Sequence, residues 1–551
     1  MPNNGFLDGQ AFSKMILSGA SNFKAHIKEI NDLNVFPIPD GDTGDNMFMT
    51  LSGGLEKIIS LKSNSISEVA LNLANGMILS ARGNSGVIFS QLFSGFAKGI
   101  NGKSTITLKE GCQALKTAVK QGYSAVLRPI EGTMLTVARE TAEKANELSD
   151  MQDLNSFFNL CLEEVKKSLD KTPELLPVLK EAGVVDSGGA GLYYFIKGMM
   201  LGSEKKDYDE LAITSVSNNL DFSKFNKDSV MEYGYCTECL LQLQTIKVDV
   251  DNFDVTIIKN YLEEVGDSAV VFKADEGVVK IHVHTFTPYK VLEFLHKFGE
   301  FLTLKIENMT LQHNGIKEEK KEEVFIKKRP HKKFALVTTA MGKGLIDVFY
   351  ELGADVVING GQTKNPSVED FLNAFDEANA DEIFVLPNNS NIILAAQKAS
   401  ELYKKSKIHL IRTKNFGQAY SILSMLDYSS DDGELIKGSM NSDMEGTITA
   451  SITSSVRDAF INNVNIKSGD YIGFTDKEMR VSSPNKLEVF EGLLETLNVK
   501  DKYFLIAVYG QNVSEDEKVK TQNLMKEKYK DIEFYEINGE QEVYDYILII
   551  E

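Results

Sequence analysis

Apolar residues recur every three or four positions through the first 200 residues of the chain. This spacing is typical of amphipathic helices, and it begins with Phe12, Met15, Ile16, Phe23, Ile27 and Ile30. Further helices are expected near 47–60, 67–81, 87–98, 107–127, 134–147, 153–170 and 190–202, with no strand between them. Thr172 and Pro173 predict the N-cap and the first position of a short helix. The first part of the chain is therefore predicted to be all-α.

Four glycine-rich segments interrupt these helices: PIPDGDTGDN, RGNSGV, RPIEGT and VVDSGGAG. Loops of such specific composition usually hold ligands. If successive helices alternate in direction, the first three segments fall at one end of the bundle. The fourth joins them if the helix over 173–183 is not a full crossing, which Pro177 favours because proline makes it a poor long helix.

The periodicity changes after residue 230. Between 232 and 309 the order is strand, helix, strand, strand, helix, strand, which predicts a ferredoxin-like α+β domain. A charge run of mixed sign over 315–333 leads into alternating strands and helices, which predict a mostly parallel sheet with helices on both faces. The predicted domains span 1–205, 230–310 and 330–551.

Length and charge restrict the class of protein. A chain of 551 residues is too long for one hydrophobic core, which agrees with several domains. The formal net charge of −20 repels phosphates and anionic membranes, so nucleic acid is not an expected partner. We expect a cytoplasmic protein, because no secretion signal or membrane-spanning segment is evident and the four cysteines are too few for a disulfide framework.

The segment DGDTG offers two carboxylates to one hard cation. Asp40 and Asp42 flank Gly41, so a tight turn can bring both oxygens close to Mg²⁺ and a nucleotide. The residues disfavour an EF-hand, since its fifth, sixth and twelfth positions would fall on Gly44, Asp45 and Leu51. A plain structural turn stays open for this motif alone.

The other glycine-rich segments strengthen the nucleotide interpretation. Gly83-Asn84-Ser85-Gly86 is expected just before a helix that begins near Val87, where free backbone amides can hold phosphate oxygens. Helix capping could explain each segment separately. The residues predicted to bind the nucleotide are Thr43, Gly44, Asp45, Asn46, Gly83, Asn84, Ser85, Gly86, Thr133, Met134, Asp186, Ser187 and Gly188.

The segments NVFPIPDGDTGDNM, RGNSGVIFSQ, PIEGTMLTVAR and VVDSGGAGL resemble the nucleotide loops of the dihydroxyacetone kinase L-subunit family. The whole chain is similar to the ATP-binding subunit of bacterial fatty acid kinase. The resemblance implies an eight-helix antiparallel barrel with aspartates that hold two magnesium ions, matched here by Asp40 and Asp42. A third aspartate is replaced by Val35, so Asn34 or Asp32 is the expected substitute, and Asp45 stands where threonine is usual.

The same resemblance implies ATP-dependent phosphorylation of fatty acids to acyl phosphates for phospholipid synthesis. The acyl substrate would be carried by a separate DegV-type protein, which the DegV-like C-terminal domain helps to dock. A fatty acid carboxylate is ionised at neutral pH, since its pKa lies near the 4.3 or so of Glu, and it needs no general base. A dihydroxyacetone-type kinase and a noncatalytic nucleotide-regulated scaffold stay open as alternatives, and so does the oligomeric state, a homodimer included.

A zinc site is implied in the middle domain. His282 and His284 lie two apart on a predicted strand and so on one face, with Cys236 on the first strand of the same domain. From these residues alone, a solvated strand face and a buried cysteine are the favoured explanation. The resemblance to fatty acid kinase subunits reverses that preference and implies Zn²⁺ on these three residues. Cys239 is left out because residues 236 and 239 of a strand point to opposite faces.

Overall fold

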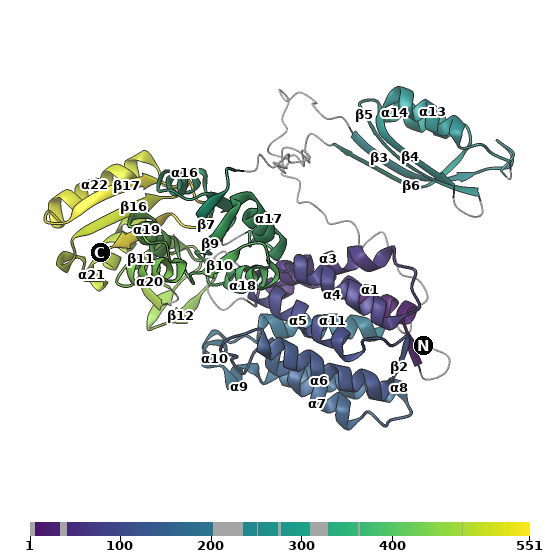
Figure 1. Cartoon of the computed structure of the whole chain (residues 1–551), viewed down its shortest axis with the longest axis horizontal. Helices are drawn as coiled ribbons and strands as arrows, with labels where there is room; N and C mark the ends of the chain where they lie inside the picture. The colour runs from purple at the N-terminus through teal and green to yellow at the C-terminus, as the bar shows by residue number, and fades with distance from the viewer. Residues whose placement is uncertain are drawn as a thin grey trace. The chain divides into compact units, whose positions relative to one another are not determined.

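The computed structural model describes residues 6–33, 41–201, 235–250, 252–273, 277–308, 329–361, 364–476 and 478–551 (Figure 1). The chain forms two compact units. One unit joins residues 1–213 to residues 327–551, and the other comprises residues 214–326. The helical and C-terminal regions therefore belong to one body.

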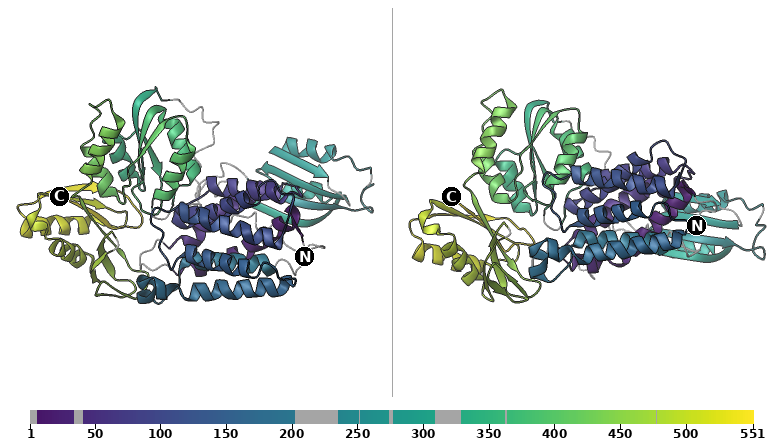
Figure 2. Two further views of the ribbon diagram at one scale, coloured as in Figure 1. Left: turned by 60° about the horizontal axis from the view of Figure 1, so that its bottom comes forward. Right: turned by 90° about the horizontal axis from the view of Figure 1, so that it is seen from below.

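The first region of the larger unit is helical, as predicted. Its long helices run alongside one another (Figure 2). They are α1 (Gly9–Ala25), α2 (Ile27–Asn31), α3 (Thr43–Ile59), α4 (Ile66–Leu79), α5 (Gly83–Gly99), α6 (Leu108–Ser124), α7 (Met134–Glu147), α8 (Leu154–Asp170), α9 (Thr172–Leu175), α10 (Pro177–Ala182) and α11 (Ser187–Leu201).

Three details differ from the sequence predictions. A short antiparallel ladder of β1 (Phe6–Asp8) with β2 (Thr105–Thr107) was not expected in this region. Thr172 is not an N-cap, because α9 already includes it and Lys171 takes the cap position. Pro177 begins α10, where its missing N–H costs no helical hydrogen bond.

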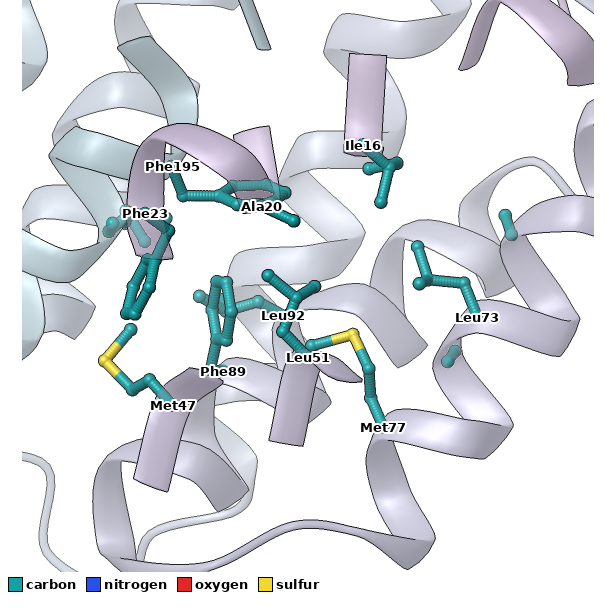
Figure 3. Close-up of a cluster of buried hydrophobic side chains, with 14 of the residues drawn as sticks. Ile16, Ala20, Phe23, Met47, Leu51, Leu73, Met77, Phe89, Leu92 and Phe195 are labelled. Carbon is teal, nitrogen blue, oxygen red and sulfur yellow. The ribbon is translucent and has the colours of Figure 1, made fainter. Parts of the chain in front are cut away.

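Aromatic and aliphatic side chains fill the interior of the helical region (Figure 3). Phe89 of α5 packs edge-on against Phe195 of α11 at a centroid distance of 5.5 Å and stacks near Phe23 of α1. Met47 of α3 is fully buried beside them. Each such side chain contributes about 1.5–3 kcal/mol through removal from water, so this core fixes the helices that carry the glycine-rich segments.

The C-terminal region contains two main sheets. The first is parallel with order β10-β9-β7-β8, from β7 (Lys332–Ala340), β8 (Val356–Asn359), β9 (Ala380–Leu386) and β10 (Lys407–Leu410). The helices that connect these strands are α16 (Lys343–Glu351), α17 (Val368–Ala378) and α18 (Ile393–Leu402). This half agrees with the predicted parallel α/β pattern.

The second sheet corrects that prediction. Its order is β15-β14-β11-β18-β16-β17, and among its paired strands only β16 and β17 are parallel. Its strands are β11 (Ile448–Ser454), β14 (Tyr471–Thr475), β15 (Glu478–Ser483), β16 (Phe504–Tyr509), β17 (Glu533–Asn538) and β18 (Tyr546–Ile550). A separate two-stranded hairpin is formed by β12 (Ala459–Ile461) and β13 (Val464–Ile466). The remaining elements are α19 (Phe416–Ser424), α20 (Gly433–Asp443), α21 (Lys486–Thr496), a short 3₁₀ helix (Val499–Asp501) and α22 (Glu515–Lys528).

The smaller unit contains a four-stranded antiparallel sheet with order β4-β5-β3-β6. Its elements are β3 (Tyr235–Leu243), α13 (Thr256–Val265), β4 (Asp267–Lys273), β5 (Val278–Thr285), α14 (Pro288–Leu295) and β6 (Gly299–Asn308). Both helices lie on one face of the sheet (Figure 1). Leu241, Ile258, Ile281 and Leu295 form its fully buried core.

Candidate functional site

Four helices begin at the glycine-rich segments, and contacts join their first turns. Ser187 Oγ at the start of α11 donates a hydrogen bond to Thr43 Oγ1 at the start of α3, at 3.3 Å. Gly188 lies against Met134, the first residue of α7. Gly83, the first residue of α5, lies against Asn46 of α3. The positive ends of four helix dipoles and their free N–H groups therefore converge, which is an arrangement suited to anions.

Asp42 occupies the N-cap position of α3. Its backbone oxygen accepts from the Asn46 N–H at 2.8 Å, but its side chain makes no capping bond. Instead, Asp42 Oδ2 accepts a hydrogen bond from Asn365 Nδ2 at 2.5 Å. Asp40 and Asn34, the other residues predicted to be catalytic, lie outside the described residues.

The extra negative charge at Asp45 is held by α2. Asn31 Nδ2 donates to Asp45 Oδ2 at 2.7 Å, while Asn31 Oδ1 accepts the Gly44 N–H at 2.7 Å. One amide side chain therefore ties both residues to the helix that precedes the motif. Asp45 makes a defined contact of its own at the start of α3.

The GNSG segment forms the first turn of α5, so the prediction that it precedes the helix was wrong. Gly83 has φ of +59°, a left-handed conformation that favours glycine. Gly86 faces Thr50 so closely that a Cβ atom would overlap the Thr50 hydroxyl oxygen. That hydroxyl donates to the Asn46 carbonyl at 2.7 Å and accepts the Arg82 N–H at 3.2 Å. These bonds join α3 to the start of α5.

The loop before α7 is braced by a polar network. Glu131 accepts hydrogen bonds from the Thr136 hydroxyl and the Tyr123 phenol, and it pairs with Arg139 at 3.1 Å. The Gly132 N–H donates to Thr136 Oγ1 at 2.8 Å. Thr133 is half-buried beside this network, whereas the Met134 side chain packs in the core. Met134 can therefore offer a ligand its backbone more readily than its side chain.

Asp186 joins two of the converging helices. Its carboxylate accepts the Gly189 N–H at 2.7 Å and also a backbone bond from Met134. Burial raises the pKa of Asp186 to about 6, although the two backbone donors act in the opposite direction. The carboxyl group is thus a weaker acid in the folded protein than a free aspartate.

Asp186→Asn is expected to raise the thermal unfolding temperature at pH 8, measured without nucleotide. In the unfolded chain Asp has a pKa of about 3.9, so the folded state favours the protonated form and loses stability as pH rises from about 4 to about 6. Asparagine keeps the acceptor oxygen without the charge. The advantage of the variant should shrink as pH falls from 6 towards 4, and an advantage that is constant with pH would contradict this account.

A pocket of about 510 Å³ opens beside the starts of α3 and α5. The helical region contributes Asp42, Thr43 and Asn84 to its wall. The C-terminal region contributes the polar side chains Thr339, Asn388, Asn389, Ser390, Asn391, Lys414, Asn415, Thr449, Ser451, Asp476, Gln541 and Tyr544. The sequence alone did not place these residues at the site. The only indication in the sequence was that the polar segments 360–375 and 386–396 follow strands, where open α/β sheets bind ligands.

The three residues predicted to bind zinc stand on paired strands of the smaller unit. The register places Cys236 opposite His284 and Glu238 opposite His282. The side chains of Cys236, His282 and His284 lie outside the described residues. Cys239 is buried in the core, and burial raises the pKa of its thiol to about 12. Among the side chains that the structure describes, no group of three or more His, Cys, Asp or Glu residues forms a metal site.

In the part of the chain that the structure describes, every helix is too short or too polar to cross a bilayer.

Known proteins resemble the chain along nearly its full length. Family models match at residues 37–201 (DAK2 domain), 232–316 (middle domain of FakA-like fatty acid kinase proteins) and 335–551 (C-terminal domain of the same FakA-like proteins). Protein YloV of Bacillus subtilis is 38% identical over 555 residues, which cover 99% of each chain. An uncharacterized protein of Staphylococcus epidermidis is 34% identical over 554 residues, again 99% of each.

A solved structure of DegV, a fatty acid binding protein from Bacillus subtilis, aligns with 40% of this chain and 98% of its own, at 10% identity and a TM-score of 0.31. The family models and the full-length relatives agree with one another and with the order of regions in the structure. The chain belongs to the FakA-like family of fatty acid kinase proteins.

Proposed function

We propose that this protein transfers the γ-phosphoryl group of ATP to the carboxylate of a fatty acid, which a separate DegV-type protein carries, and forms an acyl phosphate. The observation that supports this most is the contact among the first turns of α3, α5, α7 and α11, of which α3 carries Thr43 and is preceded by Asp42. The helix ends can hold the phosphate chain, and Asp42 can hold a divalent cation. Family membership supports the kinase class.

The site has little positive charge of its own. Lys414 is the only cation among the described residues that line the pocket, where Asp42 and Asp476 are acidic. Backbone N–H groups at Gly83–Gly86 and at the start of α11 would orient the phosphates. Bound Mg²⁺ would neutralise charge on the transferring phosphoryl group. The fatty acid carboxylate arrives ionised, so the chain needs no general base for it.

The composition of the pocket wall supports a substrate that is carried by another protein. Its wall interleaves Asn, Thr and Asp side chains with Met341, Leu345, Phe416, Phe474 and Ile547, so a long acyl chain inside it would desolvate polar groups without replacing their hydrogen bonds. A partner that shields the chain and presents only the carboxylate avoids this cost. The docking of such a partner on the C-terminal region is part of the proposal.

The test combines the purified protein with ATP, Mg²⁺ and a lipid-loaded DegV-type protein. Acyl phosphate is trapped with hydroxylamine, and ADP release is followed in parallel. We expect both products only when the partner carries a fatty acid. Phosphorylation of free dihydroxyacetone would favour the dihydroxyacetone-type kinase, and ATP binding without either product would favour a scaffold.

Zinc at Cys236, His282 and His284 is a separate proposal, which rests on the resemblance and on the pairing of Cys236 with His284. We expect about one zinc per chain by mass spectrometry of the purified protein, because a three-ligand set binds Zn²⁺ tightly. His284→Ala should remove it. His296→Ala, at an exposed histidine of the same unit, should not. A wild-type protein without zinc would contradict the site.

A further inference from the structure

One residue of the C-terminal region reaches the predicted metal ligand directly. Asn365 lies between β8 and α17 and is only 2% exposed. Its Nδ2 atom donates to Asp42 Oδ2 at 2.5 Å across 323 residues of sequence. Its Oδ1 atom is buried and has no hydrogen-bond partner among the atoms that the structure describes. A buried carbonyl oxygen without a partner is unfavourable, so its presence beside a carboxylate calls for a ligand.

The loop that carries Asn365 is fixed to the start of α5. Arg82 donates to the Asn365 carbonyl oxygen at 2.7 Å and pairs with Asp370 at 3.5 Å. The Val368 N–H donates to the Ala81 carbonyl at 3.2 Å. Ser367 caps α17 by exchanging hydrogen bonds with Asp370. The loop is thus held by two helices, and Asn365 cannot withdraw without breaking these contacts.

Buried apolar side chains surround the contact between the loop of Asn365 and the start of α5. Ala81 and Val87 of the helical region belong to the same buried cluster as Val368, Phe371 and Phe375 of the C-terminal region. Close by, Asn84 Nδ2 donates to the Ser390 carbonyl at 3.3 Å. The C-terminal region therefore contacts the first two glycine-rich segments, DGDTG and RGNSG, at Asp42, Arg82 and Asn84.

The chemistry of Asn365 fits a hard cation. Mg²⁺ takes oxygen ligands from carboxylates and from the carbonyl oxygens of amides. The oxygen and nitrogen of an asparagine exchange places when the amide turns by half a rotation, so Oδ1 can face the carboxylate of Asp42 once a cation lies between them. Asp42 and Asn365 would then supply two oxygens from two regions of the chain.

We propose that Asn365 is a ligand of the divalent cation at the phosphate site. The C-terminal region would then complete the site, and its contact with the helical region would be coupled to binding of the metal nucleotide. This proposal rests on the metal-nucleotide part of the proposed function. It also offers one oxygen ligand to a chain that has Val35 in place of the third aspartate expected from the family resemblance.

The experiment measures Mn²⁺ binding to the full-length protein by electron paramagnetic resonance, with a non-hydrolysable ATP analogue present. Asn365→Leu keeps the size of the side chain and removes its oxygen, and it should weaken Mn²⁺ binding about tenfold or more. Asn365→Asp keeps an oxygen ligand and should bind Mn²⁺ at least as tightly as the wild type. Lys364→Ala, at the exposed neighbouring residue, is the matched control and should leave binding unchanged.

Equal Mn²⁺ affinity of Asn365→Leu and wild type would overturn the proposal, and so would an equal loss in Asn365→Leu and Asn365→Asp. Thermal unfolding without metal identifies a variant that fails to fold. If Asn365→Leu fails, Asn365→Asp carries the test, because a carboxylate ligand in place of the amide should bind Mn²⁺ more tightly than Lys364→Ala does, and equal binding would then overturn the proposal. The outcome is independent of the acyl phosphate assay. Wild-type acyl phosphate formation with unchanged Mn²⁺ binding in Asn365→Leu rejects this proposal alone, whereas Asn365-dependent Mn²⁺ binding without acyl phosphate rejects only the reaction.

Discussion

Asp42→Asn is expected to lower acyl phosphate formation by about 10²–10³-fold, the usual loss when one group that stabilises transition-state charge is removed. The substitution keeps the shape of the side chain but removes the negative charge that holds a cation. The fold should survive, because Asp42 makes no side-chain capping bond to α3. Hydroxamate trapping gives the rate, and thermal unfolding without nucleotide shows whether the fold is intact.

Asp150→Asn is the matched control for this experiment. Asp150 follows the C-terminal end of α7, away from the converging N-termini, and its side chain is 82% exposed in a pair with Lys109. Exposed pairs contribute little, about 0–1 kcal/mol, so neither rate nor stability should change measurably. A rate in Asp42→Asn within about twofold of the wild type would remove Asp42 from the site.

The helices of the first region could be predicted from sequence because their apolar spacing is unambiguous. The expected range 134–147 matches α7, and the other long helices agree within a few residues. GNSG was misplaced because Gly, Asn and Ser are poor helix formers in isolation. In the structure, Gly83 and Gly86 allow α5 to begin against α3, a tertiary effect that no local pattern reports.

The antiparallel second sheet of the C-terminal region could not be predicted from alternation alone. A strand followed by a helix favours a parallel neighbour, and β16 with β17 obeys this rule. However, β18 inserts between β11 and β16 and runs antiparallel to both. Strand order within a sheet depends on pairings between distant segments, which the local period does not encode.

The meeting of the four glycine-rich segments was predictable from helix parity and from the short α9 and α10. The contacts of Ser187 with Thr43 and of Gly188 with Met134 agree with that expectation. Asn365 was not predictable, because its polar loop looks like an ordinary connection in sequence. Only the folded arrangement of the larger unit brings that loop to Asp42.

Gly86→Ala is expected to destabilise the protein by about 1–3 kcal/mol and to lower the rate by about 10²-fold. Helix propensity alone favours alanine by about 1 kcal/mol. Here the new methyl group would overlap Thr50 Oγ1, which is fully buried and held between the Asn46 carbonyl and the Arg82 N–H. Thr50 cannot turn away without losing these bonds, so α3 and α5 must separate.

Separation of α3 and α5 would move apart the two glycine-rich segments at which these helices begin. The rate should therefore fall more than the modest loss of stability alone would cause. Gly111→Ala, in α6, is the control. A Cβ atom there meets only Ile106 Cδ1 at 3.5 Å, which is an ordinary van der Waals contact. That variant should be more stable by up to about 1 kcal/mol and fully active. Denaturant unfolding and the acyl phosphate rate of both variants are compared. If Gly86→Ala behaves like Gly111→Ala, the close contact of the two helices does not position the phosphate segments.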